Sequence, residues 1–251
     1  MPPSLFPYLQ ASQRGPPGST SKKEAAVQWT KDHGLVGRES AIKDLDSICS
    51  KKACKFYQVM SVWGIAGIGK SVLVKHLFCD KICNSNVYKK YAWVHLSHPL
   101  GLWDLCRSIL LTFEYQDLQT EWTADHGTMG SKSPIVECRE MLQSPHPPSF
   151  IVIDGLHSTE EWDIIHDELV SGSNPKNVFI VTTTDERIAT HCRGPKEPLT
   201  YNVKALEPGA SFQLFKKVCF FSFSAFCYVY LVSIIRVFQR YINVQFYYKT
   251  N

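Results

Sequence analysis

The stretch GIAGIGKS, residues 64–71, constrains the fold of this chain more than any other part of the sequence. Its spacing is that of a phosphate-binding loop, G-x-x-x-x-G-K-[ST]. Glycines let the backbone turn tightly, so that several N–H groups point at one anion. The lysine of such a loop reaches the β- and γ-phosphates, and the serine ligates Mg²⁺. The sequence therefore predicts a phosphate site made of Gly64, Ile65, Ala66, Gly67, Ile68, Gly69, Lys70 and Ser71.

The sequence on both sides of this loop supports the prediction. KFYQVMSVW has the character of a buried strand, and KSVLVKHLFCDKI has that of a helix with a broad apolar face. Strand, glycine loop and helix in that order is the context in which the spacing indicates phosphate binding. The alternative is a glycine turn with a purely structural role.

Strand-like and helix-like segments alternate along most of the chain. Strands are expected at 57–63, 90–97, 150–154, 177–184 and 199–206, helices at 40–50, 70–82, 102–113, 134–143 and 209–218, and a polar loop at 114–133. This order predicts an α/β protein of the P-loop NTPase fold, a parallel sheet flanked by helices on both faces, followed by a short apolar C-terminal segment.

Composition narrows the class of protein. The net charge is +4 and no basic stripe is present, so nucleic-acid binding is not indicated. The nine cysteines form no C-x-x-C pair, which favours reduced thiols in a cytoplasmic protein. His76, Cys79 and Cys83 could be taken for metal ligands, but their spacing fits one apolar helix face better. Residues 1–33 begin with a Pro-, Ser- and Gly-rich stretch and are expected to be disordered, with an organelle-targeting role as the alternative.

A Mg²⁺-dependent phosphate site also needs an acidic residue at the end of a neighbouring strand. FIVID, residues 150–154, supplies Asp154 after four apolar residues. We expect Asp154 and Ser71 to hold Mg²⁺; a plain strand-end turn is the alternative for Asp154. The strand NVFIVTTT ends in three threonines. Two interpretations stay open: their hydroxyls sense the nucleotide, or their β-branched shape simply suits a strand.

Taken in order, six segments resemble the NB-ARC nucleotide-binding domain of plant disease-resistance (NLR) proteins, in its non-TIR branch. They are LVGRE (35–39), GIAGIGKSVL (64–73), YAWVHLS (91–97), FIVIDGLHSTEEWDII (150–165), VFIVTTTDERIA (178–189) and YNVKALEPGASFQLFKKVCF (201–220). A GTPase is disfavoured because no N-K-x-D guanine-reading motif is present.

The resemblance implies a nucleotide switch in plant defence, resting with ADP and activated by exchange for ATP. It implies an adenine pocket at Val36, Gly37 and Arg38, and a sensor strand ending at Thr183 and Thr184. The implied partners are an adenine nucleotide with Mg²⁺ and other NLR or signalling proteins.

Two departures from the family bear on hydrolysis. The family carries two consecutive aspartates where this chain has Asp154 and Gly155, and an arginine where it has Thr184. The first change removes the obvious general base, and the second removes a charge that stabilises the transition state. We therefore expect binding with little or no ATPase activity. An active ATPase that recruits an acidic residue such as Glu160 is the rival hypothesis.

The end of the sequence departs from the family as well. The GLPL and MHD motifs of the family do not appear, which indicates a truncated NB-ARC domain with residues 34–217 as its nucleotide-binding portion. Residues 218–251 form an apolar, aromatic tail, and 218–235 carry no charge. The tail could span or dip into a membrane, pack on the domain, or be an unselected extension. A membrane-attached decoy that binds a partner without nucleotide is a third hypothesis.

Overall fold

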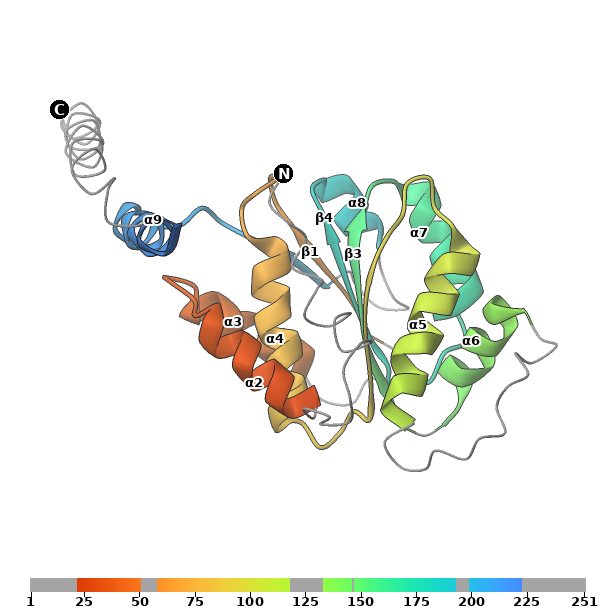
Figure 1. Ribbon diagram of the computed structural model, residues 1–251. Helices are drawn as coiled ribbons and strands as arrows, with labels where there is room; N and C mark the ends of the chain where they lie inside the picture. Colours follow the sequence, from red (N-terminus) through yellow and green to blue (C-terminus); the bar gives the residue numbers. More distant parts are fainter. Residues whose placement is uncertain (1–21, 51–57, 118–132, 146, 193–198, 223–251) are drawn as a thin grey trace. The chain divides into compact units, whose positions relative to one another are not determined.

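The computed structural model describes residues 22–50, 58–117, 133–145, 147–192 and 199–222 (Figure 1). These residues divide into two compact units, one ending at Ala205 and the other beginning at Leu206. The first unit is built on a five-stranded, all-parallel sheet in the order β2-β3-β4-β1-β5. The strands are β1 (Gln58–Trp63), β2 (Lys90–His95), β3 (Ser149–Leu156), β4 (Val178–Thr183) and β5 (Leu199–Asn202).

The central strands are buried on both faces, as expected of a parallel sheet covered by helices. In β3, Phe150 and Val152 pack into one hydrophobic cluster while Ile151 and Ile153 pack into the other. This follows from the period of two along a strand, which sends alternate side chains to opposite faces. The apolar run FIVI thus contributes side chains to the hydrophobic clusters on both faces of the sheet.

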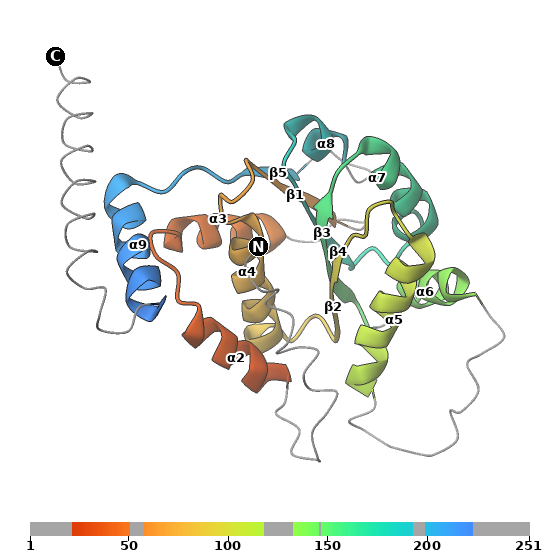
Figure 2. The same cartoon turned by 45° about the horizontal axis from the view of Figure 1, so that its top comes forward.

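Helices form one layer on each face of the sheet (Figures 1 and 2). One layer contains α2 (Lys22–Asp32), α3 (Glu39–Ser50) and α4 (Lys70–Asn84). The other contains α5 (Leu102–Asp117), α6 (Pro134–Gln143), α7 (Thr159–Ile165), the π-helical turn η2 (His166–Val170) and α8 (Glu186–His191). The predicted α/β fold with a parallel sheet between helical layers is therefore confirmed.

Three parts of the expected secondary structure differ from the structure. Within the segment 1–33, which is expected to be disordered, Lys22–Asp32 form α2, which buries Ala26 and stacks Trp29 on His33. Residues 1–21 lie outside the described residues, so the expectation for them stays a prediction. The sequence of α2 is polar and does not indicate a stable helix. Contacts with α4, including Trp29 against His76, stabilise it. Residues 114–117 continue α5 instead of beginning the polar loop, whose remainder to 132 lies outside the described residues.

The last predicted strand is also shorter than expected. β5 ends at Asn202, opposite Trp63, the last residue of β1. After Trp63, the positive φ of Gly64 turns the backbone away from the direction of β1. Residues 204–206 therefore have no continuation of β1 to pair with.

The second unit contains one described helix, α9 (Pro208–Ser222). Leu214, Phe215 and Val218 are exposed on it. Of the apolar stretch 218–235, residues 223–235 lie outside the described part, so the three interpretations of the tail remain predictions. Among the described helices, none is both long and apolar enough to cross a membrane.

Candidate nucleotide site

The glycine loop connects the end of β1 to the start of α4, as its spacing predicts. Gly64, Gly67 and Gly69 all have positive φ, at 152°, 76° and 100°. For Gly67 and Gly69 this backbone conformation alone requires glycine, because a Cβ there would meet nothing within 4 Å. At Gly64 a Cβ would also lie 3.1 Å from the carbonyl oxygen of Val203. The positive φ angles thus account for the glycines of this loop, and there is open space beside Gly67 and Gly69.

Lys70 lies folded over its own loop. Its Nζ donates to the carbonyl oxygens of Gly64 at 2.8 Å and Ile65 at 3.1 Å. Burial lowers the pKa of Lys70, and the nearby Asp154 carboxylate partly opposes that effect. A cation is therefore held above the backbone that a phosphate would contact.

Asp154 is the central acceptor of the site. Ser71 Oγ donates to its Oδ1 at 2.9 Å, Thr182 Oγ1 donates to the same oxygen, and His95 Nδ1 lies 3.0 Å from Oδ2. Burial by itself would raise the pKa of this carboxyl group. The contacts from His95, Thr182 and Ser71 outweigh burial, so the pKa is lowered below its ordinary value. Asp154 is therefore an ionised carboxylate that is almost fully buried.

The donor chemistry of Ser71 and Asp154 fits Mg²⁺. Hydroxyl and carboxylate oxygens are the ligands that this hard cation prefers, and the two side chains already meet. An ionised, buried carboxylate held by neutral hydroxyls is well suited to a divalent cation. Ser71 and Asp154 are thus the residues that would hold Mg²⁺ beside the phosphates.

The strand that carries Asp154 is not the direct neighbour of β1. β4 lies between β1 and β3, and its Thr182 sits opposite both Asp154 and Val62 in the ladder. The Thr182 hydroxyl also accepts from the backbone N–H of Gly155 at 3.0 Å. Thr182 therefore bridges the phosphate-loop strand and the carboxylate strand.

The other two threonines of the expected sensor strand lie differently. Thr183 is buried, and its hydroxyl accepts from the backbone N–H of Asp185 at 3.3 Å. Thr184 is exposed just beyond the end of β4. Of the three threonines, Thr182 is the one that contacts Asp154 directly.

Of the three residues expected around the adenine, Arg38 contacts the glycine loop. Val36 is half-buried, and Gly37 has a φ of 66°. Arg38 donates through Nη2 to the carbonyl oxygen of Ile68 at 2.9 Å and through Nη1 to that of Lys204. The guanidinium thus connects the loop to the segment that follows β5.

Two residues that contact Asp154 are not singled out by the sequence. His95 is not expected at the site, and Thr182 is expected only as one of three threonines. Both sit at carboxyl ends of parallel strands, where side chains of neighbouring strands converge. The apparent cluster of His76, Cys79 and Cys83 is a helix face, as expected. His76 is buried and its Nε2 lies 2.7 Å from the carbonyl oxygen of His33, while Cys79 is buried in the same core.

A glycine loop after β1, its lysine, and a carboxylate at the end of β3 define a nucleotide-binding protein of the P-loop class. A profile of the NB-ARC domain matches residues 39–223. The chain belongs to the NB-ARC family.

Two curated relatives illustrate the similarity. Disease resistance protein RPH8A of Arabidopsis thaliana is 23% identical over 188 residues, covering 74% of this chain and 19% of the relative. Disease resistance protein RGA4 of Oryza sativa subsp. japonica is 23% identical over 186 residues, covering 74% of this chain and 18% of the relative. The chain thus spans about a fifth of their length. Among solved structures, the Aeropyrum pernix ORC1 protein in complex with DNA has a TM-score of 0.47 and 12% identity, covering 73% of this chain and 49% of that one.

Proposed function

We propose that this chain binds ADP or ATP with Mg²⁺ and serves as the nucleotide-switch module of a plant disease resistance protein. The observation that carries the proposal is the contact of Ser71 with Asp154, beside a glycine loop covered by Lys70. The defence role is inherited from relatives that carry disease resistance in their names.

Each part of the loop has a separate role in binding. The backbone N–H groups of residues 64–71 and the first turn of the 15-residue helix α4 attract the phosphates. Lys70 exchanges its contacts with two backbone carbonyls for contacts with phosphate oxygens. Ser71 and Asp154 hold Mg²⁺, which neutralises phosphate charge when bound. Switching requires that ADP and ATP contact two arrangements of the protein differently.

We propose further that hydrolysis is slow. Gly155 has no carboxylate, and Thr184 offers a neutral hydroxyl where the family has an arginine. Glu160 is fully exposed, and hydrogen bonds at the start of α7, first with its own backbone and then with Ser158 and Thr159, lower its pKa. A carboxylate held in that way is a poor general base at neutral pH, which argues against the rival ATPase hypothesis.

Two assays on the full chain test this proposal. In the first, ATP affinity is measured with Mg²⁺ and with a chelator for the wild type and Asp154→Asn. We expect Mg²⁺ to strengthen ATP binding to the wild type only; equal Mg²⁺ dependence in the variant would contradict the role of Asp154.

The second assay follows single-turnover hydrolysis of ATP by the wild type and Lys70→Ala. We expect almost no product from either protein. Rapid hydrolysis by the wild type that Lys70→Ala abolishes would overturn the proposal of slow turnover while leaving that of binding intact.

A further inference from the structure

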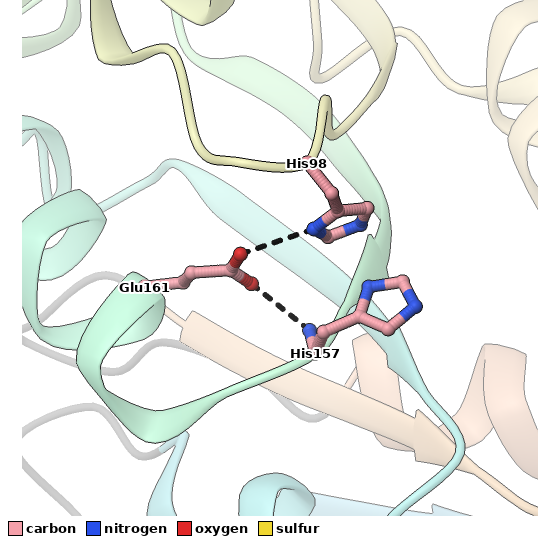
Figure 3. A group of neighbouring side chains, drawn as sticks. All are labelled: His98, His157 and Glu161. Atoms are coloured by element: carbon pink, nitrogen blue, oxygen red, sulfur yellow. Dashed lines mark hydrogen bonds and ion pairs between the residues drawn. The ribbon is translucent and has the colours of Figure 1, made fainter.

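Two histidines and a glutamate gather at the carboxyl edge of the sheet, outside the residues assigned to the nucleotide. His98 comes from the loop between β2 and α5, His157 from the loop between β3 and α7, and Glu161 from the first turn of α7. One ligand atom from each lies within 4.8 Å of the other two. Figure 3 shows both imidazole rings on one side of the Glu161 carboxylate.

The contacts in this cluster contain more acceptors than neutral rings can serve. His98 Nδ1 lies 3.1 Å from Glu161 Oε1, and His98 Nε2 lies 3.2 Å from the carbonyl oxygen of Gly155. His157 Nδ1 lies 2.8 Å from that same carbonyl oxygen. Two neutral imidazoles carry only two N–H groups for these three contacts, so one ring nitrogen faces an acceptor with its lone pair. A second proton on one ring, or a metal ion in place of that proton, removes the conflict.

The arrangement suits a metal ion that accepts nitrogen ligands. Ligands at about 2.0–2.1 Å from a tetrahedral metal are about 3.3 Å apart, close to the 3.1 Å between His98 Nδ1 and Glu161 Oε1. A histidine ligand commonly donates its second ring N–H to a backbone carbonyl, and the Gly155 oxygen is placed to accept from Nε2 of His98, whose Nδ1 faces Glu161. The His98 side chain is 38% exposed and the Glu161 side chain 16%, so an ion can enter from solvent.

We propose that His98, His157 and Glu161 form a Zn²⁺ site, separate from the Mg²⁺ ligands Ser71 and Asp154. Two imidazoles and one carboxylate are a donor set that zinc accepts and magnesium does not prefer. The ion connects two loops that meet beside Gly155, the residue after Asp154. Its binding therefore stabilises the folded state, because the three ligands are assembled only there.

Glu161 retains its local role with or without the ion. Its backbone N–H is capped by Ser158 Oγ at 3.1 Å, and its Oε2 accepts from the backbone N–H of His157 at 3.0 Å. Glu161→Gln keeps an oxygen for the second contact and removes the negative charge. It is therefore a mild substitution with which to test the metal.

The test is isothermal titration of the full-length chain with Zn²⁺, together with thermal unfolding with and without the ion. We expect one site in the wild type whose affinity falls at least about tenfold in His98→Ala, His157→Ala and Glu161→Gln. The unfolding midpoint should rise with Zn²⁺ in the wild type and not in these variants. His191→Ala, an exposed histidine that pairs with Asp163, is the matched control and should bind as the wild type does.

Cobalt substitution separates this site from cysteine sites. Co²⁺ bound by nitrogen and oxygen lacks the near-ultraviolet band of a thiolate complex, and Cys83→Ala should leave the spectrum unchanged. Unaltered Zn²⁺ binding in all three variants, or no binding by the folded wild type, would overturn the proposal. Lys70→Ala should keep the zinc site while losing nucleotide, so failure here is distinguishable from failure of the proposed function.

Discussion

Ser71 and Asp154 are 83 positions apart in the sequence, yet Ser71 Oγ donates to Asp154 Oδ1 at 2.9 Å. Ser71 lies in the first turn of α4, after the glycine loop, and Asp154 lies near the end of β3, two strands away from β1. This contact brings the last residue of the GIAGIGKS motif together with the carboxylate that we propose holds Mg²⁺. Its geometry depends on the intervening strand β4.

Thr182 of β4 should support that geometry through its hydroxyl. Thr182→Val keeps the shape of the side chain but removes a donor to Asp154 and an acceptor for the Gly155 N–H. Because both partners are then left without this bond in a buried setting, we expect the free energy of unfolding to fall by about 1–3 kcal/mol. Urea unfolding measures the loss. The control Thr184→Val, at an exposed position of the same segment, should change stability little, and equal losses would contradict the bridging role.

Arg38 should act on nucleotide affinity through the glycine loop. Its guanidinium holds the carbonyl oxygens of Ile68 and Lys204 together, which a lysine ammonium cannot do with the same fork. We expect Arg38→Lys to weaken ADP binding by roughly 2- to 10-fold, the equivalent of one lost hydrogen bond. Fluorescence titration with a labelled ADP measures this. Arg107→Lys, exposed on α5, should have no effect, and an unchanged affinity in Arg38→Lys would show that the loop does not need this connection.

Gly155 should tolerate asparagine better than valine. Its φ of 93° lies at an irregularity in the pairing of β3 with β4, where a Cβ would meet nothing within 4 Å. The cost is thus one of backbone conformation, about 1–2 kcal/mol for an ordinary side chain and less for Asn or Asp. Urea unfolding should rank wild type above Gly155→Asn and Gly155→Asn above Gly155→Val. Equal stability of the two variants would contradict this explanation of the glycine.

Lys75 should make stability depend on pH. Burial lowers its pKa from 10.5 to about 8, although the ring faces of Trp93 and Phe78, 4.5 and 5.0 Å away, favour the charged form. Between those two pH values the unfolded chain holds a proton that the folded protein has lost, so this residue's contribution to stability rises with pH. Below pH 8 the charged ammonium of Lys75 costs about 3 kcal/mol of stability.

We therefore expect Lys75→Met to be more stable than the wild type at pH 7, by an amount that shrinks as the pH approaches 10.5. Comparing the two proteins cancels the titration of other groups that they share. Chemical unfolding at several pH values measures the difference. The exposed Lys31→Met serves as the control, and a difference that stays constant with pH would contradict the assignment.

Much of this fold could be predicted from the sequence, because the signals are local. The apolar run before Asp154 and the glycine spacing of residues 64–71 each follow from one short stretch. The order of strands could not be read in this way, since the position of β4 between β1 and β3 depends on packing over the whole sheet. For the same reason, the contacts of His95 and Thr182 with Asp154 required the structure.

The histidine and glutamate cluster shows the same limit. His98 and Glu161 are 63 positions apart, and neither belongs to a recognisable metal motif. α2 shows the opposite problem: its composition is polar, and contacts with α4 supply the stability that its own sequence does not indicate.

Equilibrium binding of ADP by the full-length chain tests the central claim most directly, with Lys70→Ala as the variant. Lys176→Ala is the matched control, because this exposed lysine precedes β4 at the opposite edge of the sheet. We predict saturable binding by the wild type and the control, weakened roughly 10- to 100-fold in Lys70→Ala through loss of charge-assisted contacts. A folded wild type that binds no ADP, or that binds it as tightly as Lys70→Ala does, would contradict the account.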